Sequence, residues 1–130
     1  MDRTGKTIVA KFGGSSVGDA AKIRACAARV AAMVRAGHRV AVVVSAMGDT
    51  TDELLELAAE VATEPARREL DQLLSTGEIV SVSLVAMALQ GMGIDGVSLS
   101  GQQCGIQTDA QHTRARISGI DGTRLEREWI

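Results

Sequence analysis

Residues 40–44 are apolar at every position, and this run constrains the fold more than any other feature of the sequence. A strand that is apolar throughout is typical of a parallel sheet covered on both faces. A β-branched run at residues 7–12 predicts an earlier strand. Between the two runs, Asp19 is a favourable N-cap, apolar residues recur at helical spacing, and Gly37 ends the helix. Together these segments predict a β-α-β unit.

The middle of the chain predicts further helices. Thr50 and Glu53 have the spacing of a capping box at the start of a second helix, and Pro65 follows that helix. Beyond the proline, a helical stretch with three leucines leads into the polar segment 75–78. An apolar helix over residues 79–89 comes next.

The last third of the chain gives weaker signals. A third strand is predicted at residues 96–100, after two glycines, and residues 114–118 could be an extended piece. Thr123 and Glu126 have the spacing of a capping box for a last helix. Because strands and helices alternate, residues 1–130 predict a three-layer α/β domain with a mainly parallel sheet.

Composition excludes several classes of protein. Lys and Arg number 14 and Asp and Glu 16, and the net charge of −2 excludes a strongly basic surface for nucleic acid or anionic membranes. The longest uncharged run, residues 79–94, is shorter than the ~20 apolar residues that span a bilayer, so it fits a core helix better. Cys26 and Cys104 have neither CxxC nor zinc-ligand spacing. We therefore expect reduced thiols in a cytoplasmic protein without nucleic-acid or membrane partners.

Three polar segments follow predicted strands: residues 11–16, 45–51 and 100–103. In an open parallel sheet, ligands bind beyond the carboxyl ends of the strands. In the first segment, Gly13 and Gly14 leave backbone N–H groups unshielded and Lys11 adds a positive charge, which favours an anion such as phosphate. The spacing fits neither a Walker A loop nor a dinucleotide-binding fingerprint. On spacing alone, a glycine turn beside a solvated lysine is an equally good interpretation.

The polar segments belong to longer motifs that resemble one family. The motifs are Lys11-Phe12-Gly13-Gly14-Ser15-Ser16-Val17, Val43-Val44-Ser45-Ala46-Met47-Gly48-Asp49-Thr50-Thr51-Asp52 and Ser75-Thr76-Gly77-Glu78. In this order and at these separations they closely resemble aspartokinase, in the amino-acid kinase superfamily, and residues 107–117 look similar to that family too. The resemblance implies the amino-terminal part of a kinase domain, without the later glycine-rich segment and the regulatory ACT domains of full aspartokinases.

The resemblance implies ATP-dependent phosphorylation of the side-chain carboxylate of L-aspartate to 4-phospho-L-aspartate, at the entry to lysine, threonine and methionine synthesis. It makes Lys11 the catalytic residue, which stabilises charge on the transferred phosphoryl group, while the nucleotide carries Mg²⁺. The residues implied in nucleotide binding are Lys11, Phe12, Gly13, Gly14 and Ser15. The residues implied in substrate binding are Ser45, Thr51 and Glu78, the last holding the ammonium group.

The three substrate-binding residues also have structural interpretations. Glu78 lies three positions after Ser75, so it could complete a capping box at the start of the apolar helix. Thr51 could belong to the first turn of a helix, and Ser45 could be a loop hydroxyl. The implied site further requires that the Lys11 amine and the Glu78 carboxylate lie on the same side of the sheet.

Two other functions stay open at this point. One is a kinase for another amino acid, such as N-acetylglutamate. The other is a non-catalytic binding or regulatory module that pairs with a full-length kinase. Because the resemblance covers only part of a kinase domain, we expect negligible activity from this polypeptide alone. An apolar face without its covering elements favours a homo-oligomer or a complementing kinase chain.

Overall fold

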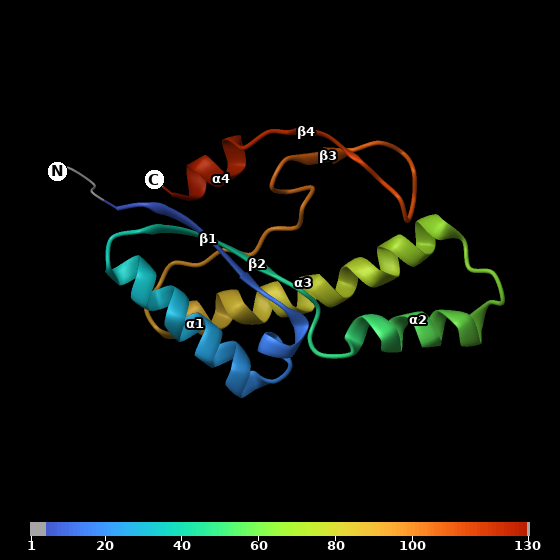
Figure 1. Ribbon diagram of the computed structural model, residues 1–130, viewed down its shortest axis with the longest axis horizontal. Coiled ribbons are helices and arrows are strands. Elements are labelled where there is room, and N and C mark those ends of the chain that lie inside the picture. The colour runs from blue at the N-terminus through green and yellow to red at the C-terminus, as the bar shows by residue number, and fades with distance from the viewer. Residues whose placement is uncertain (1–4, 130) are drawn as a thin grey trace.

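The computed structural model describes residues 5–129 (Figure 1). The elements in chain order are β1 (Thr7–Phe12), the 3-10 helix η1 (Gly14–Val17), α1 (Ala20–Arg35), β2 (Arg39–Val44), α2 (Thr50–Val61), α3 (Arg67–Gly91), β3 (Ile106–Thr108), β4 (Ile117–Ile120) and α4 (Thr123–Glu128). β1 and β2 pair in parallel, from Thr7 opposite Arg39 to Phe12 opposite Val44. The predicted β-α-β unit is therefore confirmed.

α1 begins and ends where its sequence predicts. The Asp19 carboxylate accepts a hydrogen bond of 2.8 Å from the backbone N–H of Lys22, which satisfies a free amide of the first turn. At the other end Gly37 has φ = +87°, a conformation that favours glycine. Ile23 and Val30 are buried on the inner side of the helix, as the helical spacing predicts.

The two-stranded sheet is covered on one face only within residues 5–129. Alternate side chains, Phe12 and Val42 among them, pack into a core shared with α1 and α3, and Figure 1 shows the strands passing over these two helices. On the other face Val9 is 69% exposed and Val43 is 48% exposed. The predicted α/β fold with a parallel sheet is confirmed, and within residues 5–129 it consists of the sheet and one helical layer of the three predicted layers.

α3 is one continuous helix of 25 residues, whereas the sequence predicted a separate polar segment at residues 75–78. The hydroxyls of Ser75 and Thr76 donate to the carbonyls of Gln72 and Leu73 at 2.7 and 2.6 Å. Both hydroxyls are thus satisfied inside the helix and do not cap a new one. By length and composition α3 is the one described helix that could cross a membrane, a test that core helices of soluble proteins also pass.

Neither predicted capping box forms. The N-cap of α2 is Asp49, and the Thr50 hydroxyl instead donates to the Met47 carbonyl at 2.6 Å. In α4, Thr123 is the first helical residue, and its hydroxyl donates to the Asp121 carboxylate at 2.6 Å. This hydrogen bond, with a second one from the Thr123 backbone N–H, lowers the pKa of Asp121. Both threonines lie one position after the N-cap, a shift that spacing alone does not reveal.

The end of the chain departs most from the sequence-based prediction. Residues 96–100 form no strand, and the predicted extended piece at 114–118 overlaps β4, which pairs antiparallel with β3. The tip of this hairpin contacts α3. There the Asp71 carboxylate accepts a hydrogen bond of 2.8 Å from the Thr113 backbone N–H and lies 3.2 Å from Nδ1 of His112.

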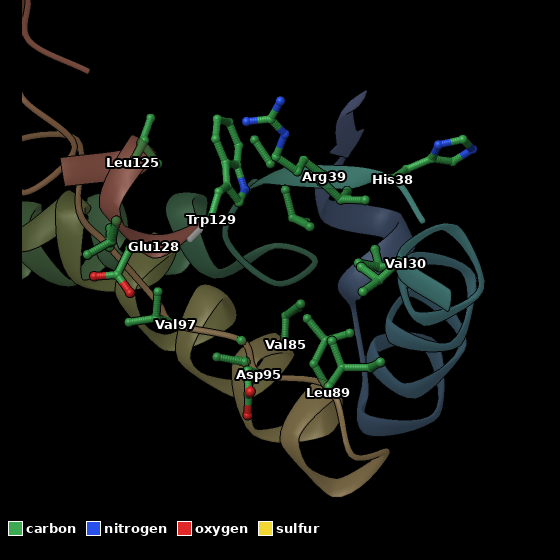
Figure 2. A pocket seen from close by; sticks show the side chains of 18 of the residues that line it. Val30, His38, Arg39, Val85, Leu89, Asp95, Val97, Leu125, Glu128 and Trp129 are labelled. Carbon is green, nitrogen blue, oxygen red and sulfur yellow. The ribbon is translucent and has the colours of Figure 1, made fainter. Parts of the chain in front are cut away.

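An apolar cavity of about 650 Å³ lies between β2, α1, α3 and the end of the chain (Figure 2). Val85 and Leu89 of α3 line one side of it, and Val97 and Trp129 line another. The Arg39 guanidinium, at the start of β2, lies 6.0 Å from the centre of the Trp129 ring. The cavity borders the first residues of β2, so it lies away from the carboxyl end of the sheet.

Candidate functional site

The loops that follow β1 and β2 lie against each other at the carboxyl end of the sheet. The backbone N–H of Ser45 donates to the Phe12 carbonyl at 3.1 Å, and that of Gly48 donates to the Gly14 carbonyl at 3.0 Å. Gly14 has no room for a side chain, because a Cβ there would lie 2.9 Å from the Ala46 carbonyl oxygen. Backbone contacts therefore join two of the three polar segments that the sequence singled out.

Gly13 has surroundings unlike those of Gly14. Its φ of −73° is one that any residue adopts, and a Cβ there would meet no atom within 4 Å. Neither backbone conformation nor packing of the described residues requires glycine at this position. A backbone without a side chain, beside open space and at the start of η1, lets an anion approach the N–H groups closely. The open space beside Gly13 thus leaves its backbone accessible from outside the molecule.

Lys11 is exposed and is the penultimate residue of β1, opposite Val43. Side chains alternate along a strand, so Lys11 lies with Val9 on the uncovered face, opposite to Phe12 and the helices. α3, which carries Glu78, packs on the covered face. Lys11 and Glu78 therefore lie on opposite sides of the strands. Over the length of the strands, the requirement that the Lys11 amine and the Glu78 carboxylate share one side of the sheet is not met. They can approach one ligand only beyond the carboxyl end of the sheet.

Glu78 is an exposed residue inside α3. The helix runs through Ser75 and Glu78 without interruption, so the interpretation of Glu78 as part of a capping box is wrong. The neighbouring Gly77 is buried, and a Cβ there would lie 3.0 Å from Cβ of Ala46. This close contact brings the turn of α3 that carries Glu78 against the loop after β2.

Ser45, the first residue after β2, and Thr51, in the first turn of α2, are both half-buried. Thr51 is the second residue of α2, so its interpretation as a residue of the first helical turn is confirmed. The Ser45 carbonyl accepts a hydrogen bond of 2.7 Å from the hydroxyl of Ser81, a fully buried residue of α3. Sequence reasoning missed Ser81, because a lone serine in an apolar helix gives no signal of a bond to another element.

The other predicted nucleotide-binding residues contribute differently. The Phe12 side chain is buried in the core, where the Arg29 guanidinium lies 5.8 Å from the centre of the Phe12 ring. The part of Phe12 that borders the loop is its backbone, whose carbonyl accepts a hydrogen bond from Ser45. Ser15 is exposed in η1. The third polar segment forms a turn of its own, closed by hydrogen bonds between Ser100 and Gln103 at 2.9 and 3.2 Å.

The titratable groups of residues 5–129 form no group of three or more His, Cys, Asp or Glu side chains that could hold a metal ion. Both cysteines are free. Partial burial raises the pKa of Cys104, against a smaller opposing effect of Arg124. Its thiol is therefore not activated as a nucleophile. The chemistry available at the joined loops is charge stabilisation by Lys11 and by backbone N–H groups.

A glycine loop after the first strand, joined by backbone hydrogen bonds to a second polar loop after the next parallel strand, defines an α/β protein with a candidate ligand site at the carboxyl end of its sheet. The sequence model of the amino acid kinase family matches residues 6–127, and the chain belongs to this family. Within it, the chain is 53% identical over 120 residues to the aspartokinase of Geobacillus stearothermophilus and 54% identical over 118 residues to aspartokinase 2 of Bacillus subtilis (strain 168).

These alignments cover 92% and 91% of the chain, but 30% and 29% of the two relatives. The chain thus spans about 30% of the length of the curated relatives that it matches. Among solved structures, the aspartate kinase from Synechocystis aligns with a TM-score of 0.71 and 47% sequence identity. That alignment covers 77% of this chain and 17% of the solved chain.

Proposed function

We propose that the chain supplies the phosphate loop and part of the amino-acid pocket of an aspartate kinase. Such an enzyme transfers a phosphoryl group from ATP to the side-chain carboxylate of L-aspartate and forms 4-phospho-L-aspartate, the first step toward lysine, threonine and methionine. The observation that supports this most is the union of the two loops, with Gly13 facing open space, in a chain about half identical to aspartokinases.

The proposed roles follow from the chemistry of phosphoryl transfer, which asks the protein for positioning and charge stabilisation. Backbone N–H groups of Gly13 and Gly14 lie along the phosphates, and the Lys11 amine offsets negative charge on the transferred group. Glu78, which shares a side with Lys11 only beyond the carboxyl end of the sheet, pairs there with the ammonium group of the substrate. The hydroxyls of Ser45 and Thr51 contact nucleotide or aspartate. ATP brings Mg²⁺ with it. The substrate carboxylate is ionised at neutral pH and needs no general base.

These 130 residues by themselves are expected to turn over ATP at a negligible rate. In-line transfer needs both reactants held in place, and a misplacement of ~1 Å costs about a hundredfold in rate. The uncovered sheet face at Val9 and Val43 supports association with a second copy or with a complementing kinase chain. It also favours the alternative of a non-catalytic module that pairs with a full-length kinase. The two free cysteines agree with a cytoplasmic protein.

A two-ligand titration followed by amide NMR tests the proposal. Adding Mg²⁺ with a non-hydrolysable ATP analogue should shift the amides of residues 11–15, and adding L-aspartate should shift those of residues 45–51 and Glu78. N-acetylglutamate in place of aspartate should leave the second set unchanged. Lys11→Ala should weaken nucleotide binding about tenfold or more, because the phosphates lose a charge-assisted contact. Lys6→Ala, an exposed lysine just before β1, is the matched control and should bind as the unchanged chain does.

Shifts that fall elsewhere, or that are absent for both ligands, would contradict the proposed function. A coupled assay adds a second check. Aspartate-dependent ATP turnover by the purified chain, abolished by Lys11→Ala, would overturn the expectation of negligible activity while supporting the assigned chemistry. A stoichiometric complex with a full-length aspartokinase, measured by light scattering, together with no ligand shifts, would favour the non-catalytic module.

A further inference from the structure

Ser81 is the one polar residue that is fully buried in the described part of the chain. Its hydroxyl lies 2.7 Å from the Ser45 carbonyl oxygen and 3.1 Å from the carbonyl oxygen of Glu78 in its own helix. The longer contact is the ordinary bond that a helical serine makes to the preceding turn. The shorter contact joins two elements that are 36 residues apart in sequence. Buried polar groups are almost always hydrogen-bonded, and here the buried hydroxyl is the donor to a carbonyl of another element.

The bonded carbonyl belongs to the first residue after β2. The backbone N–H of Ser45 continues the sheet by donating to Phe12, and its carbonyl turns toward α3 and accepts from Ser81. The next residue, Ala46, is 3% exposed and lies against Gly77, one helical turn before Ser81. The loop is thus held to α3 at two successive turns of the helix.

Glu78 lies between these two attachment points. Gly77 precedes it directly, and Ser81 follows it by three positions and approaches its carbonyl oxygen. The position of the Glu78 turn relative to the Ser45 loop is therefore set by one close packing contact and one buried hydrogen bond. The packing contact limits how near the two elements come, and the directional hydrogen bond limits how far they slide.

We propose that Ser81 is a positioning residue for the amino-acid substrate, which locks the Ser45 loop to the segment of α3 that carries Glu78. This inference rests on the proposed function, since Ser45 and Glu78 are the substrate-binding residues that it holds together. Ser81 itself touches no ligand. Its effect falls on the amino-acid side of the site, because the bonds from Ser45 to Phe12 and from Gly48 to Gly14 do not involve its hydroxyl.

The test compares Ser81→Ala with Ser83→Ala, a half-buried serine on the same helix. Ser81→Ala should leave the Ser45 carbonyl without its donor. The ¹³C chemical shift of the Ser45 carbonyl should then move away from the value typical of a hydrogen-bonded carbonyl. The amides of residues 45–48 should show microsecond-to-millisecond exchange in relaxation-dispersion experiments. Aspartate affinity should fall about tenfold while affinity for the Mg²⁺–ATP analogue stays within twofold. Ser83→Ala should change none of these readouts.

Several results would overturn the inference. One is unchanged aspartate affinity and a rigid loop in Ser81→Ala, and another is an equal loss of both ligands. If Ser81→Ala does not fold, the Ser81 hydroxyl proton of the unchanged chain provides the test instead. This proton should exchange slowly with water and show a nuclear Overhauser effect to the Ala46 amide proton. Rapid exchange without that Overhauser effect would refute the hydrogen bond to the Ser45 carbonyl. Failure of the proposed function looks different, because the unchanged chain would then bind neither ligand, whatever the order of its loop.

Discussion

At the scale of single residues, two adjacent glycines in the loop after β1 have different physical reasons to be glycine. Gly14 faces the Ala46 carbonyl oxygen at a distance that a Cβ atom does not tolerate. Gly13 has an ordinary backbone conformation and faces open space. The packing of the protein explains the first, whereas neither packing nor backbone conformation explains the second, which we assign to the proposed phosphate contact.

Alanine substitutions should separate these two reasons. Gly14→Ala should lower the free energy of unfolding by about 1–3 kcal/mol, as overpacking commonly does. Gly13→Ala should leave stability unchanged or raise it by up to about 1 kcal/mol, because alanine restricts the unfolded chain. Gly13→Ala should nevertheless weaken binding of the Mg²⁺–ATP analogue about tenfold, because its methyl group occupies the space at the loop. Urea unfolding and the NMR titration measure the two effects. A Gly13→Ala chain that binds the analogue normally would contradict the phosphate site.

The site residues were only partly predictable from sequence. The two glycines, Lys11 and the loop after β2 lie at the ends of predicted strands, and strand ends can be located from hydrophobic pattern. Ser81 and the packing role of Gly77, which the sequence named only as part of a motif, escaped detection because they depend on contacts with residues more than 30 positions away. The face on which Lys11 lies also depends on which side of the sheet the helices cover, and that is a property of the tertiary fold.

At the scale of elements, α3 organises the molecule, since it contributes to the core and contacts the loop after β2. Its middle contains Gly77, although a glycine in a helix interior costs roughly 0.5–1 kcal/mol relative to alanine. The contact with Ala46 explains this choice. Gly91, at the end of the same helix, serves as a comparison, because a Cβ there would meet no other atom within 4 Å.

Gly91→Ala should raise the free energy of unfolding by about 0.5 kcal/mol, through helix propensity alone. Gly77→Ala should gain the same free energy from helix propensity but lose more through overpacking, because the new Cβ would lie 3.0 Å from Cβ of the buried Ala46. We expect Gly77→Ala to be the less stable of the two variants by about 1 kcal/mol or more in urea unfolding. Equal stabilisation by both substitutions would show that the loop moves aside easily.

The elements themselves were predictable where local signals agree with the tertiary fold. β1, α1 and β2 have strong periodicity, a matching cap and a terminating glycine, and all three form as predicted. The break predicted at residues 75–78 was wrong, because serine and threonine hydroxyls can bond to the preceding turn and stay helical. The strand predicted at residues 96–100 was wrong because a strand needs a neighbour to pair with, and β2 pairs only with β1 among the described residues.

At the scale of the whole molecule, the chain divides into a packed core and a loosely attached end. Among residues 5–129, the buried residues all lie at or before Leu89, and most of those from Gly101 to Trp129 are exposed. The end of the chain is attached through the Asp71 contacts at the hairpin tip and through the stacking of Arg39 on Trp129. A segment with few buried apolar contacts opens at a lower free energy than the core.

Trp129, the one tryptophan, should therefore report an early transition. In a urea titration its fluorescence should change at a lower urea concentration than the far-UV circular dichroism of the helices. Asp71→Ala should move the fluorescence transition to still lower urea and leave the helical transition in place, because it removes the acceptor of Thr113. Glu69→Ala, whose carboxylate pairs only locally with Arg68, is the control. Coincident transitions in the unchanged chain would show that the end unfolds with the core.

The contact between Gly77 and Ala46 also limits how this part of the molecule can diverge. Glycine and alanine are the two smallest residues, so the Ala46 methyl group is the only volume that the pair can give up, and it makes room for no more than one methyl group at Gly77. A larger side chain at Gly77 or Ala46 pushes α3 away from the loop after β2 and stretches the hydrogen bond between Ser81 and the Ser45 carbonyl. Homologues that keep the hydrogen bond between Ser81 and the Ser45 carbonyl should therefore keep small residues at both positions. The neighbouring solvent-exposed positions of α3 can vary in sequence.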